Sequence, residues 1–217
     1  RQMCIRDSGR VVTIENGVDL VRFRASAPRE RRPSLIYFGR LSSNKRIGAL
    51  FPILSHLRAV SPDWRLIIAG REHDVTVEAL RREAVQCGVL EAVDFVDSPS
   101  DETLTRLIDS ASYFISASAY EGFGIAALEA MSAGLLPILS RIAPFKALLG
   151  RANAGILMDP AQAETTACSI ALYHERMNVR LRVEQDRLMT FANTRDWAQV
   201  ARTYVNEYEA ALAEAQA

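Results

Sequence analysis

The stretch YFISASAYEGFGIAALEAMSAGLLPILS, residues 113–140, decides the fold. It opens with a short apolar run at residues 113–116 and passes through a turn that contains Gly122 and Gly124. A helical pattern follows, and a second apolar run stands at residues 136–139. Both runs are apolar nearly throughout, which is typical of strands covered on both faces. A strand, a helix and a second such strand predict a parallel sheet with helices packed on it.

The same alternation extends over most of the chain. Further apolar runs stand at residues 11–14, 35–38, 65–69, 93–96 and 155–158. Apolar residues at helical spacing occupy residues 47–60 and 104–111, and Ser100 and Asp159 are placed to cap helix starts. We therefore expect an α/β fold, a Rossmann-like parallel sheet with helices on both faces and a helical C-terminal tail.

We expect three parts along the chain. Residues 1–8, RQMCIRDS, lack any periodicity and resemble a translated sequencing adapter, so we interpret them as a non-native end; the alternative is a short natural loop. Residues 9–177 would form the sheet-bearing lobe, and residues 178–217 the C-terminal helices. The last helix carries an apolar stripe from Trp197 to Leu212 that needs a partner surface. We expect the chain to be the back part of a longer protein.

Composition and charge exclude several classes of function. Lys and Arg number 26 and so do Asp and Glu, so no basic excess attracts nucleic acid. The arginine-rich residues 23–33 are typical of a solvated linker. The longest apolar stretch, residues 124–139, is broken by polar residues and is shorter than the roughly 20 residues of a transmembrane helix. Three cysteines without a CxxC pair indicate neither a disulfide framework nor a zinc site, and they fit a reducing cytoplasm.

Two loops that follow predicted strands carry the chemistry of the chain. In sheets of this kind, ligands bind beyond the carboxyl ends of the strands. The first loop, GRLSSNKR at residues 39–46, places Arg40 and Lys45 just after a strand. Arg40 could bind two phosphate oxygens at once, and Lys45 could supply a compact positive charge beside them.

The backbone of the second loop suits a phosphate. Gly122 and Gly124 let the main chain approach a ligand closely, because no side chain stands in the way. The helix that begins near Gly124 offers unpaired amides at Phe123, Ile125 and Ala126, together with the positive end of the helix dipole. This loop therefore predicts a diphosphate site.

Two glutamates flank that site. Glu129 lies one helical turn beyond Ile125 on the same face, and paired ribose hydroxyls would satisfy its carboxylate. Glu121 lies on the turn itself and could reach a sugar beyond the phosphates. Each feature alone has an ordinary explanation: a tight turn, an exposed helical acid, or the solvated loop charges of Arg40 and Lys45. Their joint placement at strand ends favours a binding site.

These residues resemble the C-terminal, donor-binding lobe of the GT-B retaining glycosyltransferases known as group 1 or family 4. The resemblance covers nearly everything from residue 11 onward. ENGVDL at 15–20 resembles the family's entry turn, LIYFGRLSSNKR at 35–46 its phosphate loop, WRLIIAG at 64–70 its next strand, and residues 121–140 its signature. The signature is specific, because seven residues separate Glu121 from Glu129 around a GFG turn.

The resemblance implies a role for each candidate. Glu121 would be the catalytic residue that contacts the donor sugar near its reacting carbon, and Glu129 would hold the ribose. Val96 would meet the base through its backbone. The two cations of the first loop and the amides of Gly124 to Ala126 would stabilise the departing diphosphate, where negative charge grows. Such enzymes retain anomeric configuration and usually need no metal or other cofactor, and the leaving phosphate can accept the acceptor's proton.

IIAGRE, PSDETL and the signature resemble most the α-mannosyltransferases of xanthan- and acetan-type polysaccharide assembly. Those enzymes take GDP-mannose and a lipid-diphosphate-linked disaccharide, although no residue here selects guanine over uracil. Acceptor recognition in the family belongs to an N-terminal lobe that this chain lacks, toward which the last helix would cross. We therefore expect nucleotide-sugar binding with little or no transfer by the chain alone. The expected location is the cytoplasm, at the inner membrane face if the acceptor is lipid-linked.

Three other functions stay open. Residues 122–127 match the GxGxxA pattern of dinucleotide-binding oxidoreductases, but that pattern needs an acid about 20 residues later, where Arg141 and Ile142 stand. A nucleotide-sugar epimerase of the same fold is the second alternative, and the spacing of Glu121 and Glu129 favours transfer over it. The third is a binding or scaffolding domain that kept the lobe and lost the chemistry.

Overall fold

The computed structural model describes residues 12–19 and 31–215. Six strands form one parallel sheet in the order β3-β2-β1-β4-β5-β6. The strands are β1 (Ser34–Phe38), β2 (Arg65–Gly70), β3 (Val93–Asp97), β4 (Tyr113–Ser116), β5 (Leu136–Ser140) and β6 (Ile156–Met158). This architecture confirms the predicted α/β fold with a Rossmann-like parallel sheet.

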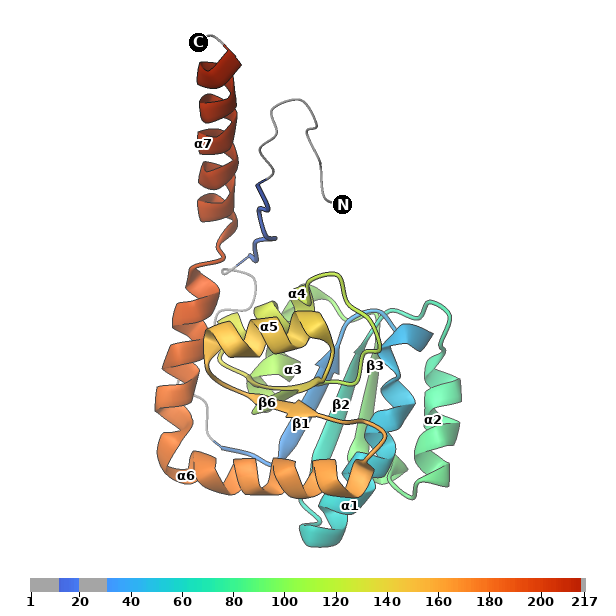
Figure 1. The fold of residues 1–217 in the computed structure, drawn as a ribbon. Helices are drawn as coiled ribbons and strands as arrows, with labels where there is room; N and C mark the ends of the chain where they lie inside the picture. The colour runs from blue at the N-terminus through green and yellow to red at the C-terminus, as the bar shows by residue number, and fades with distance from the viewer. Residues whose placement is uncertain (1–11, 20–30, 216–217) are drawn as a thin grey trace.

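Helices cover both faces of the sheet (Figure 1). They are α1 (Leu50–Val60), α2 (Val77–Gln86), α3 (Asp101–Ser110), α4 (Ile125–Ser132), α5 (Ala143–Ala152), α6 (Ala163–Asn193) and α7 (Trp197–Ala215). Right-handed crossovers place α1 and α2 on one face and α3, α4 and α5 on the other. Because α6 packs against both α1 and α4, it ties the two helical layers together.

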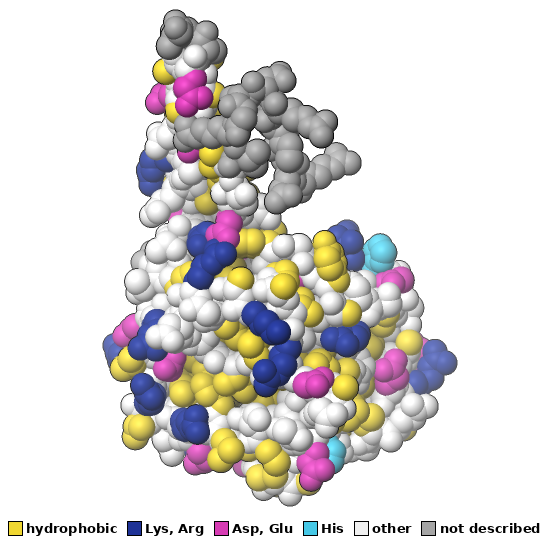
Figure 2. Space-filling view, in the orientation of Figure 1, with side chains coloured by type: hydrophobic (Ala, Val, Ile, Leu, Met, Phe, Trp, Pro, Cys, Tyr) yellow, Lys and Arg dark blue, Asp and Glu magenta, His cyan; other side chains and the backbone are white. Residues whose placement is uncertain are grey.

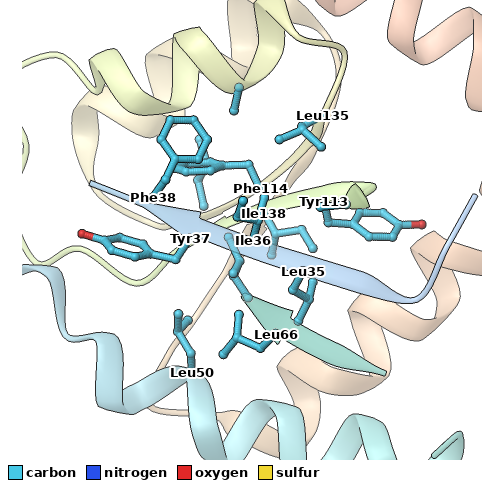
Figure 3. Close-up of a cluster of buried hydrophobic side chains, with 14 of the residues drawn as sticks. Leu35, Ile36, Tyr37, Phe38, Leu50, Leu66, Tyr113, Phe114, Leu135 and Ile138 are labelled. Atoms are coloured by element: carbon cyan, nitrogen blue, oxygen red, sulfur yellow. The ribbon is translucent and has the colours of Figure 1, made fainter. Parts of the chain in front are cut away.

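The core lies at the centre of the sheet, around β1 and β4. Figure 3 shows Phe38 and Phe114 together on one face, and Leu50 on the other side beside Leu66. The rings of Phe38 and Phe114 lie 5.0 Å apart between centroids, and all four side chains are buried. Strands that are buried on both faces explain why these runs are apolar without alternation.

The prediction of a strand at residues 11–14 is wrong for residues 12–14, which form no strand, while Val11 lies outside the described residues. The segment docks instead at the junction of α6 and α7. The Val18 amide donates to the Arg195 carbonyl at 2.8 Å, and Glu15 forms ion pairs with the side chains of Arg151 and Arg195. The backbone of this segment thus finds its partners at a helix junction rather than at a sheet edge.

The structure can be compared with the three parts that we predicted along the chain. The proposed non-native end, residues 1–8, lies outside the described residues, as does most of the linker at 23–33. The border predicted at residue 177 falls within α6, which changes direction part-way along and leads to α7 (Figure 1). In the described ranges, no helix is both long and apolar enough to cross a bilayer.

Candidate functional site

The candidate site lies where the sheet order reverses. Strands β1 and β4 are neighbours, but the chain continues from β1 to β2 on one side and from β4 to β5 on the other. The loops that follow β1 and β4 therefore diverge, and such a switch point forms a crevice at the carboxyl ends of the strands. A cavity of about 900 Å³ occupies this position, a size suited to a ligand of several rings.

Eight of the ten predicted site residues line this cavity. They are Arg40, Lys45, Glu121, Gly122, Phe123, Gly124, Ile125 and Ala126. Glu129 and Val96 do not line it: Glu129 lies half-buried on α4, and Val96 lies on β3, two strands from β1. The roles of all ten residues stay predictions. The structure does bring the cations of one loop and the acid of the other to one place.

Lys45 and Glu121 form an ion pair inside the cavity. The Lys45 ammonium lies 2.5 Å from Glu121 Oε1, and both side chains are largely buried, at 20% and 17% exposure. The Ser118 hydroxyl donates to the same carboxylate oxygen at 2.8 Å. Because two donors bind the same oxygen, the orientation of the carboxylate is fixed, and Glu121 and Lys45 line the cavity as a preformed ion pair.

The first loop is held in shape by short-range hydrogen bonds. A single 3₁₀ turn, Ser43–Lys45, follows Ser42, whose carbonyl accepts from the Lys45 amide at 2.9 Å. Asp74 anchors the turn, because it accepts from the Ser43 hydroxyl at 2.6 Å and from the Ser43 amide at 3.1 Å. The Ser43 hydroxyl is the main cause that lowers the pKa of Asp74 to about 2. The turn aims Lys45 at the cavity.

Tyr37 holds the start of the same loop. Its hydroxyl donates to the Arg40 carbonyl at 2.8 Å at the wall of the cavity. Burial raises the pKa of Tyr37 and the negative charge of Glu121 raises it further, against the opposing charge of Arg40. The phenol therefore stays protonated at neutral pH and remains a donor that fixes the backbone at Arg40.

The second loop delivers the N-terminus of α4 to the cavity. Gly124 caps the helix with φ +89°, a conformation that favours glycine, and a Cβ there would lie 2.8 Å from Phe145. The first turn of α4 contains no acid that would cancel the helix dipole. Gly122 differs, because a Cβ at that position would meet no atom within 4 Å. Helix amides thus stand beside Lys45 at the cavity wall, an arrangement suited to phosphate.

The sequence did not predict several residues that line the cavity or join its two loops. Arg46 donates to the carbonyls of Ala117 and Ser118 at 2.9 and 3.3 Å, across 71 and 72 positions of the chain. Asn44 bonds to the second loop through both its backbone and its side chain. Segment 12–16 and Tyr204 of α7 complete the wall. No local pattern predicts these contacts, because each depends on the order of strands in the sheet.

Within the described ranges, no group of three His, Cys, Asp or Glu side chains is arranged to hold a metal ion. That the reaction needs no metal stays a prediction. Arg40, Lys45 and the N-terminus of α4 all line the cavity, and each presents positive charge or the positive end of a helix dipole there.

The family model of the group 1 glycosyl transferases matches residues 21–186, which is most of the chain. The chain belongs to the group 1 glycosyltransferases. The predicted family resemblance is therefore confirmed, and with it the assignment of this chain to a glycosyltransferase rather than to an oxidoreductase.

Curated glycosyltransferases are similar in sequence to nearly the whole chain. A GDP-mannose:cellobiosyl-diphosphopolyprenol alpha-mannosyltransferase of Komagataeibacter xylinus is 38% identical over 96% of this chain and 53% of its own length. The enzyme of that name from Xanthomonas campestris is 37% identical over 94% of this chain and 53% of its own. The chain thus spans about half the length of these curated relatives.

Solved structures share the fold. Anabaena Alr3699/HepE in complex with UDP superposes with a TM-score of 0.78, at 19% identity over 91% of this chain and 57% of that one. The pneumococcal O-GlcNAc transferase GtfA, in complex with UDP and GlcNAc, gives 0.75 at 20% identity over 94% of this chain and 40% of its own. The chain therefore has the fold of these glycosyltransferase structures.

Proposed function

We propose that this chain is the nucleotide-sugar-binding lobe of a retaining glycosyltransferase. The observation that carries the proposal is the cavity at the sheet's switch point, where Lys45, Glu121 and the N-terminus of α4 lie in one wall. A diphosphate requires compensation of its negative charge, and a sugar requires a fixed acceptor for its hydroxyls. The cavity wall supplies both from loops held by the same sheet.

The chemistry follows from where charge develops. Cleavage of the bond between sugar and diphosphate leaves positive charge on the sugar and negative charge on the leaving group. Arg40, Lys45 and the α4 amides would stabilise the leaving group, and Lys45 and the α4 amides are held in place before the reaction begins. The carboxylate of Glu121, fixed by Ser118, would lie against the sugar near its reacting carbon. We propose that the leaving phosphate accepts the proton of the acceptor.

We propose GDP-mannose as the donor. The support is the 36–38% identity to three enzymes named as GDP-mannose-dependent alpha-mannosyltransferases. Both solved structures compared above hold UDP instead, so the fold alone does not select the base. Glu129 would hold the ribose and Val96 the base, although both lie outside the wall of the cavity and would meet a part of the nucleotide that extends beyond it.

We propose that the acceptor is recognised outside this chain. The relatives are named for a cellobiosyl-diphosphopolyprenol acceptor, and the chain spans about half of their length. Transfer by the chain alone would then be weak or absent, and a lipid-linked acceptor would bring the enzyme to the cytoplasmic face of the membrane. We also propose that the apolar stripe of α7 packs toward the remaining lobe.

Thermal-shift measurements with GDP-mannose, UDP-glucose and UDP-N-acetylglucosamine test the donor. We expect GDP-mannose to raise the melting temperature most, since only a bound ligand stabilises the folded chain. A larger shift with UDP-glucose would overturn the choice of base and sugar but keep a donor site. No shift with any of the three would contradict the proposed function.

Two substitutions separate the roles of the glutamates. Glu129→Ala should weaken binding of GDP and GDP-mannose alike, because ribose is present in both. Glu121→Gln should spare GDP and weaken GDP-mannose, because only the second ligand carries the sugar. Calorimetric titration measures all four affinities, and equal losses for both ligands in Glu121→Gln would count against its role.

A further inference from the structure

The loops after β1 and β4 are joined by a dense set of cross-loop hydrogen bonds. The Ala119 amide donates to the Asn44 carbonyl at 2.8 Å, and the Asn44 side chain donates to the Tyr120 carbonyl at 3.3 Å. Lys45 adds its ion pair with Glu121. Arg46 completes the set with hydrogen bonds to the carbonyls of Ala117 and Ser118. Residues 44–46 of the first loop thus contact residues 117–121 of the second.

Arg46 occupies an unusual backbone conformation. Its φ of +47° and ψ of +45° lie in the left-handed region, which only three described non-glycine residues adopt. A glycine would take this conformation freely, whereas a side chain makes it costly. Strain of this kind persists where the surrounding contacts outweigh it, and it gathers at functional sites. The side-chain contacts of Arg46 with two carbonyls, together with its backbone hydrogen bonds to Ser43 and Ala49, are available to outweigh it.

Those contacts lead to the catalytic candidate. Arg46 Nε donates to the Ala117 carbonyl, and its Nη2 donates to the carbonyl of Ser118. The Ser140 hydroxyl also donates to the Ser118 carbonyl, at 2.6 Å, so both lone pairs of that oxygen are occupied. Ser118 is fully buried, and its hydroxyl holds the Glu121 carboxylate at 2.8 Å. The Arg46 guanidinium therefore fixes the backbone of Ser118, and the Ser118 hydroxyl in turn fixes the carboxylate of Glu121.

We propose that Arg46 is a positioning residue that locks the turn after β4, so that Ser118 and Glu121 keep the orientation the donor sugar requires. The left-handed conformation is what makes this possible, since it closes the 3₁₀ turn and sends the side chain back across the loop. The inference deepens the proposed function, on which its ligand-binding consequence rests. The locking of the turn itself is a property of the chain without ligand.

The first test needs no ligand. Arg46→Gly relieves the backbone strain and removes the lock, so the melting temperature should stay close to that of the wild type. The Ala119 amide, protected by the Asn44 carbonyl across the loops, should exchange with solvent about fivefold faster, as expected when a hydrogen-bonded contact of this strength is lost. Hydrogen exchange followed by NMR measures this single amide.

Asn153→Gly is the matched control. Asn153 has φ +48° and ends α5, so the substitution removes the same kind of strain at a residue that does not line the donor cavity. We expect unchanged exchange at Ala119 in this variant. Arg46→Lys keeps the charge but lacks the two separate donor nitrogens that reach the two carbonyls, so its exchange rate should fall between those of wild type and Arg46→Gly. This variant carries the test if Arg46→Gly does not fold. Wild-type exchange in the Arg46 variants, or faster exchange spread evenly over the core, would overturn the proposal.

The second test connects the lock to the donor. Calorimetric titration of Arg46→Gly should give wild-type affinity for GDP and about fivefold weaker affinity for GDP-mannose. If Glu121→Gln weakens GDP-mannose selectively and Arg46→Gly does not, the positioning role fails while the proposed function stands. If Glu121→Gln changes the affinity for neither ligand, the proposed role of Glu121 fails; if the wild type binds neither ligand, the proposed function fails. In both cases the exchange of Ala119 still decides whether Arg46 locks the turn.

Discussion

Gly122 and Gly124 stand two residues apart in one turn, and the structure places different demands on them. Gly124 has φ +89° and lies against Phe145, so it serves the fold. Gly122 has open space where a Cβ would stand and lines the cavity, so its missing side chain matters to an occupant and not to the protein. The sequence shows only that two glycines lie in one turn. The backbone angles and the neighbouring atoms show that Gly124 is required by the fold and that Gly122 is not.

Alanine substitutions should divide these two purposes. Gly124→Ala should lower the melting temperature by several degrees, because a left-handed alanine and the clash with Phe145 together cost about 1–3 kcal/mol. Gly122→Ala should leave the melting temperature unchanged and weaken GDP-mannose about tenfold, or roughly 1.4 kcal/mol. Thermal unfolding and calorimetry give both quantities, and a destabilised Gly122→Ala variant would show that its space is not open.

His174 predicts a pH dependence of stability. Its Nδ1 lies 2.8 Å from the Tyr113 hydroxyl, and its ring packs on Trp64 at 5.0 Å between centroids. Burial lowers the pKa of His174 to about 4, helped by the charge of Arg31 and opposed by that of Glu175. Between about pH 6.5 and 4 the unfolded chain therefore binds more protons than the folded one, so stability present above pH 6.5 is lost as the pH falls.

The variant His174→Gln isolates that effect. Glutamine can still bond to the Tyr113 hydroxyl but does not titrate, so its melting temperature should fall less than that of the wild type between pH 6.5 and 4. Melting curves over this range measure the difference, which removes the contribution of carboxylates common to both proteins. Parallel curves for the two proteins would contradict the burial-driven shift.

At the scale of helices and strands, sequence motifs predict an element correctly where the contact that forms it lies within a few residues. Ser100 caps α3 as predicted, with its hydroxyl accepting from the Thr103 amide at 3.2 Å. Asp159 accepts from the Ala161 amide, yet α6 begins only at Ala163. The predicted strand at 11–14 failed because a short apolar run says nothing about whether a partner strand is available. Its neighbours at Gly17 and Val18 pack instead on the α6–α7 junction.

That docking predicts the effect of Gly17→Ala. A Cβ at Gly17 would lie 2.8 Å from the Trp197 ring, so the segment should separate from the junction and the first turns of α7 should exchange amide hydrogens faster. Gly150→Ala on α5 is the matched control, because its Cβ meets nothing within 4 Å and alanine favours helix. Exchange measured by mass spectrometry should leave α1 to α5 unchanged in both variants; unchanged α7 in Gly17→Ala would disprove the docking.

At the scale of the whole molecule, the arrangement of the sheet brings separate loops together into one site. Each apolar run predicted as a strand agrees with an observed strand within one residue, apart from the run at 11–14, because buried parallel strands have a clear apolar pattern. The contact of Lys45 with Glu121 depends on the adjacency of β1 and β4, which periodicity could not show; the sequence predicted only that both loops follow strand ends. The sequence did not predict the contact between Arg46 and Ser118, because this contact depends on the same adjacency of β1 and β4.

The projecting helix α7 is the other whole-molecule feature. Figure 2 shows hydrophobic side chains on its surface as it stands away from the body, and Trp197, Val205, Tyr208 and Leu212 are each about half exposed or more. Tyr204 alone of this stripe reaches the cavity wall. A second lobe docked on α7 would therefore also close one side of the donor site, which fits the proposal that transfer needs more than this chain.

The proposed function requires that a nucleoside diphosphate bind beside Lys45, and calorimetric titration with GDP and UDP tests this binding most directly. The wild-type chain should bind at least one of them, and Lys45→Ala should bind it about tenfold more weakly, as expected for the loss of a charged hydrogen bond. Lys146→Ala, an exposed lysine outside the cavity wall, should behave as the wild type. Wild-type affinity in Lys45→Ala, or no binding of either nucleotide by the wild type, would contradict the account.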